Sequence, residues 1–204
     1  AIAIRERLIN EEGQAHLAND LALAYMGKAI ALLGLNRLAE AITEYDRAIT
    51  IHERLINEEG QAHLANDLAT AYANKALALE TQQEWDAAFA CYDDAVRIRS
   101  VCVAQGMYWL MPSLLKCFND RLNTRLRLRR WREAAADVEA VIGHLESFLE
   151  DERIHDELKQ AAGREKERML RYLRRLDADG RESLYAELGE RAATVRQLVE
   201  ADGA

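Results

Sequence analysis

The segment from Ile4 to Ala22 reads IRERLINEEGQAHLANDLA, and the segment from Ile51 to Ala69 reads IHERLINEEGQAHLANDLA. The two copies differ only where Arg5 is replaced by His52, and their offset is 47 residues. Self-similarity at a fixed spacing is typical of helical repeat arrays, in which each unit buries its apolar face against the next one. The repeated segment therefore predicts an array of similar units.

A weaker third copy follows the first two. Gly106 corresponds to Gly60, and Trp131 corresponds to Trp85. Both offsets are 46 residues, so the third copy is one residue shorter than the 47-residue spacing of the first two. We therefore expect three repeated units over residues 14–152.

Each unit is expected to contain two helices. Apolar residues recur at helical spacing on both sides of the short segments 34–36 and 81–83, which we interpret as turns within a unit. Gly60 can adopt the left-handed conformation that ends one helix before the next begins. A helix pair of this kind must stack on its neighbours to bury its apolar face.

The composition agrees with a helical globular protein. Half of the 204 residues are hydrophobic, 30% are charged, and the chain has one proline. The net charge of −8 argues against broad affinity for nucleic acid or anionic membranes. We found no signal peptide and no apolar run long enough for a membrane span, so a cytoplasmic location is the expectation.

Two stretches carry a family resemblance. NKALALETQQEWDAAFACYDDAVRI, from Asn74 to Ile98, resembles a tetratricopeptide repeat, as does GKAIALLGLNRLAEAITEYDRAITI, from Gly27 to Ile51. Residues that match the small and aromatic packing positions of that family are Ala29, Ala41, Ala48, Tyr25 and Tyr45 in the first unit and Ala76, Ala88, Ala95, Tyr72 and Tyr92 in the second. The family's period is 34 residues, so the longer offset here implies elongated helices.

This resemblance implies an all-α fold, a right-handed α-solenoid of antiparallel helix pairs with a C-terminal helical cap. Residues 1–13 match the end of a second helix, so we expect a truncated preceding repeat there and a natural protein that extends upstream. The repeat pattern fades near residue 153. Two apolar stripes, from Ile154 to Leu176 and from Leu184 to Leu198, predict a two-helix cap over residues 153–204, because terminal repeats need a polar outer surface.

The differences between the two near-identical units indicate a surface. Six positions differ between residues 22–34 and 69–81, at the spacing of one helix face, and seven are identical. In tetratricopeptide proteins these first-helix positions line a concave peptide-binding groove. The predicted groove residues are Leu23, Met26, Gly27, Ile30 and Leu33 in the first copy of the repeat, Thr70, Ala73, Asn74, Leu77 and Glu80 in the second copy, and Lys116, Asn119, Asp120, Asn123 and Arg127 in the third copy.

Such a groove would change from apolar to polar along its length and would suit a peptide with one apolar and one polar end. Asn74 and Lys116 also match positions with which some family members hold a C-terminal carboxylate, whereas Met26, Ile30 and Asp120 depart from that pattern. The alternative is that duplicated helices diverged on the face that packing constrains least.

Other motifs have simpler interpretations. Six arginines between Arg121 and Arg132 could contact phosphate, but the repeat places a turn near residues 127–130 that would break their stripe. The carboxylates around His16 and His63 lack metal-ligand spacing, so no metal or other cofactor is predicted. The odd cysteine count gives no disulfide framework, and we interpret Cys91, Cys102 and Cys117 as core thiols. We interpret the three tryptophans, Trp85, Trp109 and Trp131, as packing residues, and the alternative for Trp109, which lies near Met107 and Met111, is an exposed contact.

The sequence therefore predicts a module that binds a protein or peptide, within a larger protein, and no enzyme active site. One alternative is a structural spacer or self-association element, which would form a homo-oligomer. Another is the sensor region of an enzyme whose catalytic domain lies outside this sequence.

Overall fold

The computed structural model describes residues 2–10 and 15–201, and these residues form helices and short connections without a strand. The α-helices are α1 (Ile2–Asn10), α2 (Ala18–Gly34), α3 (Leu38–Asn57), α4 (Ala65–Thr81), α5 (Trp85–Ala104), α6 (Met111–Arg127), α7 (Trp131–Glu150), α8 (Asp156–Arg174), α9 (Ala178–Leu188) and α10 (Ala192–Glu200). Single 3-10 turns lie at Ala15–Leu17, Ala62–Leu64, Tyr108–Leu110 and Gly189–Arg191.

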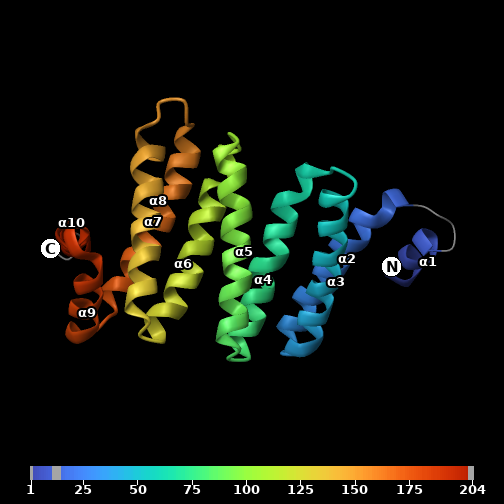
Figure 1. Ribbon diagram of the computed structural model, residues 1–204, viewed down its shortest axis with the longest axis horizontal. Coiled ribbons are helices and arrows are strands. Elements are labelled where there is room, and N and C mark those ends of the chain that lie inside the picture. The colour runs from blue at the N-terminus through green and yellow to red at the C-terminus, as the bar shows by residue number, and fades with distance from the viewer. Residues whose placement is uncertain (1, 11–14, 202–204) are drawn as a thin grey trace. The chain divides into compact units, whose positions relative to one another are not determined.

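The prediction of an all-helical chain built of helix pairs is confirmed, and the chain divides into two compact units, Ala1–Gln105 and Gly106–Ala204. Within the first unit α3 packs against both α2 and α4, and α4 packs against α5 (Figure 1). Within the second unit α6 packs against α7, and α8 packs against both of them.

The turns within the pairs repeat with the sequence. Asn36, Gln83 and Arg129 all have left-handed backbone, with φ of 56°, 65° and 56°. Their spacing matches the offsets of 47 and 46 residues between the three copies. Each turn joins a first helix of 17 residues to a second helix of 20 residues, which are α2 and α3 in the first copy.

The predicted role of Gly60 is also confirmed. Gly60 and Gly106 lie between pairs with φ of 69° and 92°, a region that favours glycine because it has no Cβ. Gly13, the third member of this set, lies outside the described residues.

Alanines allow the helices to approach one another closely. Ala29, Ala41 and Ala48 have no exposed surface, and the same holds for their counterparts in the next pair, Ala76, Ala88 and Ala95. Tyr45 and Tyr92 fill the larger spaces and are 0% and 1% exposed. The packing positions predicted from the sequence therefore form the core of the first unit, except Tyr72, which is half-buried and packs against that core.

In two of the three helix pairs, an ion pair joins the first helix to the second. Its two residues are equally far apart along the chain in both cases. Lys28 Nζ lies 2.7 Å from Glu44 Oε1, and Arg121 donates to Asp137 Oδ1 with its Nη2 at 2.5 Å. The middle pair has Cys91 at the position of these acids, and its Lys75 instead lies 2.6 Å from Asp46.

The segment predicted to form a two-helix cap contains three α-helices, α8, α9 and α10. The second apolar stripe, from Leu184 to Leu198, does not run along one helix, because Gly189 interrupts it with φ of 53° and ψ of −121°. Only residues without a Cβ adopt such a backbone readily, so the chain turns there and α10 begins on a new axis.

Two equivalent tyrosines give a matched test of this core. The Tyr92 hydroxyl donates to Glu80 Oε2 at 3.1 Å, whereas the buried Tyr45 hydroxyl has no hydrogen-bond partner among the described residues. The residue that corresponds to Glu80 is Leu33. We expect Tyr45→Phe to leave the free energy of unfolding unchanged or raise it, and Tyr92→Phe to lower it by about 1 kcal/mol, because only the second change removes a hydrogen bond.

Urea unfolding followed by circular dichroism measures both differences. A larger loss of stability for Tyr45→Phe than for Tyr92→Phe would contradict this account of the two sites.

Candidate functional site

Part of the predicted groove forms an exposed stripe on the first helices of the first unit. Leu23 and Ile30 of α2 are 43% and 55% exposed, and Leu77 of α4, the counterpart of Ile30, is 51% exposed. Gly27 is also exposed, and Asn74, its counterpart, is half-buried. These five residues are hereafter called the α2/α4 stripe.

Two predicted groove residues of α2 instead belong to the core. Met26 is 7% exposed within the main core cluster of this unit, and Leu33 packs against that cluster. The prediction that Met26 lines a groove is wrong, because at about 100° per residue its side chain lies to one side of the stripe and enters the core, and the half-buried Leu33 lies on that same side. Glu80, the counterpart of Leu33, is half-buried, and so is Ala73, the counterpart of Met26.

The difference between Leu23 and Thr70 has an internal cause. Arg99 donates to Thr70 Oγ1 at 2.8 Å and to Asn66 Oδ1 at 3.3 Å. At the position of Arg99 the first pair has His52, whose Nε2 lies 3.1 Å from Asn19 Oδ1. Histidine is too short to use a second acceptor further along the helix, so a leucine replaces the threonine.

Two predicted groove residues of the third copy, Asn119 and Asp120, face α8 rather than solvent. Asn119 is fully buried and donates to the backbone carbonyl of Glu165 at 2.8 Å. Asp120 accepts from Arg168 of α8 at 2.7 Å and pairs with Lys116 at 2.5 Å. The assignment of Asn119 and Asp120 to an open groove is therefore wrong, since α8 packs on both of them.

Of the other three residues of that set, Asn123 is half-buried, and Lys116 and Arg127 are exposed. Asn123 is the polar counterpart of Ile30 and Leu77, so the exposed apolar stripe is a property of the first unit. The structure therefore brings five of the predicted residues together on the α2/α4 stripe, and it gives Asn119 and Asp120 a packing role against α8.

The arginine run does not form a continuous stripe. Arg121 and Arg125 both donate to Asp137, at 2.5 and 2.7 Å, and Asp137 is 1% exposed. The helix then ends at Arg127, and α7 begins at Trp131. The predicted turn is confirmed, and these two guanidinium groups are directed to a buried carboxylate.

The cysteines are buried, as predicted. Burial raises the pKa of Cys91 and of Cys102, which disfavours the reactive thiolate. His63 is exposed, and within residues 2–10 and 15–201 no group of three or more His, Cys, Asp or Glu side chains is arranged to hold a metal ion. Trp109 is 60% exposed, so its interpretation as a packing residue is wrong and the alternative of an exposed residue holds.

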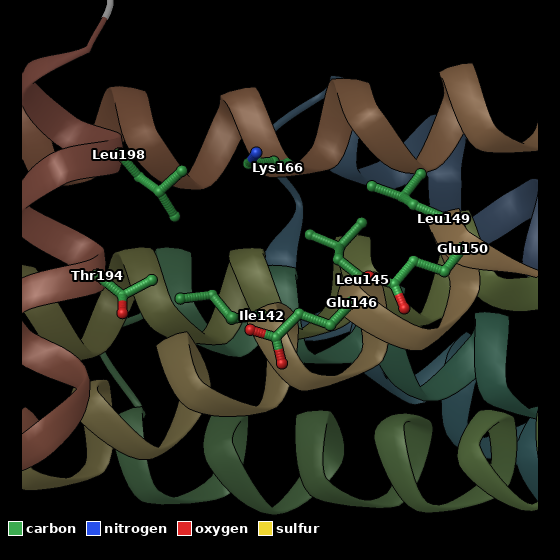
Figure 2. A pocket seen from close by; sticks show the side chains of 8 residues that line it. All are labelled: Ile142, Leu145, Glu146, Leu149, Glu150, Lys166, Thr194 and Leu198. Carbon is green, nitrogen blue, oxygen red and sulfur yellow. The ribbon is translucent and has the colours of Figure 1, made fainter.

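A cleft in the second unit was missed by the sequence reasoning (Figure 2). It encloses about 260 Å³ between α7, α8 and α10. Its apolar residues are Ile142, Leu145, Leu149 and Leu198, and Lys166 and Glu146 also line it. The apolar residues of α7 recur at helical spacing, but the sequence could not show that α10 turns back at Gly189 and leaves space between them.

Comparison of the sequence with models of known protein families gave no match, and comparison with curated proteins gave none either. The tetratricopeptide resemblance therefore stays a prediction based on the packing residues. None of the helices in the described part of the chain has the length and apolar character needed to cross a bilayer.

The His52 site predicts a pH dependence of stability. Burial lowers the pKa of His52 below its ordinary value, and its Nδ1 has no hydrogen-bond partner among the described residues. Below about pH 6.5 the unfolded chain binds a proton at this histidine that the folded chain resists. The free energy of unfolding should therefore fall as pH decreases from 7 to about 5.5, and His52→Gln should make that slope shallower.

Urea unfolding at a series of pH values measures the slope. The exposed His63 provides a matched control, because His63→Gln should leave the slope as in the wild type. Equal slopes for the wild type and His52→Gln would contradict the assignment.

Proposed function

We propose that this chain is a protein- or peptide-binding module and that the α2/α4 stripe is its contact surface. The fold is expected to be a tetratricopeptide-like solenoid, in which such first-helix positions face the ligand. Binding requires no catalytic group, and we propose no catalytic role for these residues.

Gly27 supports this proposal most directly. It lies in the interior of α2, where glycine destabilises a helix by about 1 kcal/mol relative to alanine. A Cβ built at Gly27 would meet no atom within 4 Å outside the local helix, so packing within the described chain does not require glycine. Glycine at this position leaves room for the backbone of a partner to approach the helix closely between Leu23 and Ile30.

The exposed aliphatic side chains supply a driving force. Ile30 and Leu77 are each more than half exposed, and burying the rest of such a side chain contributes roughly 1 kcal/mol. Their equivalent positions suit a partner that presents apolar residues to both helices. An amphipathic peptide, helical or extended, has this pattern, and polar residues at its other end would suit Asn74.

Charge substitutions test the surface. Selection from a displayed library of random peptides should enrich binders of the wild-type chain, and Ile30→Glu with Leu77→Glu should weaken their affinity at least tenfold, because the change places two carboxylates against apolar groups. Val101→Glu is the matched control. Val101 is 51% exposed on α5, a second helix of the same unit, and its substitution should leave affinity unchanged.

Affinity is measured by fluorescence anisotropy on variants with wild-type helicity. Equal losses for the stripe variant and Val101→Glu would refute the proposal. Light scattering over a concentration series tests the alternative of self-association, for which the stripe variant would lower the molar mass.

Gly27→Ala separates binding from stability. We expect the substitution to raise the free energy of unfolding by about 0.5–1 kcal/mol, because alanine has a higher helix propensity than glycine. It should also lower the affinity for the selected peptides, because the added methyl group would collide with them. Urea unfolding and anisotropy measure the two effects. A more stable chain with unchanged affinity would remove the argument from Gly27.

A further inference from the structure

The cleft between α7, α8 and α10 continues into a second hollow on α8. The second hollow has a volume of about 690 Å³ and shares Leu149 and Lys166 with the first. In Figure 2 Thr194 and Leu198 lie at one end of the first hollow, and Leu149 lies at the other. The two hollows form one site with an apolar part and a charged part, here called the α8 cleft.

The charged part of the α8 cleft is basic. Arg164, Lys166 and Arg171 line it, and none of them has an ion-pair partner among the described residues. Glu167, which also lines it, lies 3.8 Å from Arg174. These three cations stand out in a chain whose net charge is −8.

The acidic residues of the apolar part do not cancel this charge. Glu146 pairs with Arg191 at 2.8 Å, so it is already neutralised. Glu150 is the remaining carboxylate and has no partner among the described residues. Three cations without a partner therefore face one such carboxylate.

We propose that the α8 cleft binds an acidic peptide segment that carries an apolar anchor residue. The anchor side chain enters the hollow beside Ile142, Leu145 and Leu198, and carboxylates next to it meet Arg164, Lys166 and Arg171. Burial of the anchor supplies affinity, and the charges supply orientation and a faster association. This site lies in the second unit and is independent of the α2/α4 stripe.

The shape and charge of the cleft favour this ligand over others. Nucleic acid would leave the apolar hollow unfilled and would place phosphates near Glu150. A fatty acid could fill the hollow, but its single carboxylate would satisfy only one of the three cations. A peptide can offer one apolar side chain and several carboxylates within a few residues.

Labelled peptides of defined composition provide the probe. The test peptide holds one leucine among glutamates, and two matched peptides replace either the glutamates by glutamine or the leucine by serine. We expect the test peptide to bind and each matched peptide to bind at least tenfold more weakly. Added salt should lower the affinity for the test peptide. Equal binding of the three peptides, or binding of laurate alone, would overturn the proposal.

Variants of the chain locate the site. Lys166→Glu should weaken the test peptide at least tenfold, and Thr194→Trp should do the same by filling the hollow from the exposed face of α10. Arg175→Glu is the control, since Arg175 is an exposed cation at the end of the same helix and does not line the cleft.

All variants are compared at equal helicity and melting temperature. If the variants Lys166→Glu and Thr194→Trp bind the test peptide as tightly as Arg175→Glu does, the proposal is overturned. The stripe variant with Ile30→Glu and Leu77→Glu should bind this peptide as the wild type does, so failure at one site is distinguished from failure at the other.

Discussion

The close packing of paired helices on alanine is the constraint on which the rest of the structure depends. Ala29, Ala41 and Ala48 are fully buried in the first pair, and their counterparts are equally buried in the second. A larger side chain at any of them would push the two helix axes apart, at a cost of typically 1–3 kcal/mol. Because helix spacing is set there, the remaining positions are free to differ between copies.

Most of those differences are accommodated within the chain. The pair of His52 and Leu23 in one copy becomes Arg99 and Thr70 in the next, where the longer cation uses the threonine hydroxyl. In the same way Leu33 becomes Glu80, which accepts from the hydroxyl of Tyr92. These substitutions exchange one local contact for another, so they say little about a ligand.

The differences that remain carry the functional argument. Ile30 and Leu77 are both aliphatic and both exposed, and Gly27 lacks any neighbour that would require it. All three leave surface that the described chain does not cover. A partner that covers these positions would therefore gain stabilising free energy from burying them. The α8 cleft is a second such surface, in the other unit.

The sequence by itself determined the helix pairs, their turns and their packing residues. The 47-residue repeat and the apolar periodicity specify these locally, since a turn at residues 34–36 or a left-handed Gly60 depends on neighbouring residues alone. It also determined which first-helix positions vary. It could not separate Met26 from Gly27, because one helical step decides whether a side chain enters the core.

Only the tertiary structure decided what each variable position contacts. Asn119 and Asp120 were assigned to a groove by their register, yet α8 packs on them and takes their hydrogen bonds. Likewise, the apolar residues of α7 became the wall of a cleft because Gly189 turns α10 back toward them. Such contacts join residues that lie far apart along the chain, and no local pattern specifies them.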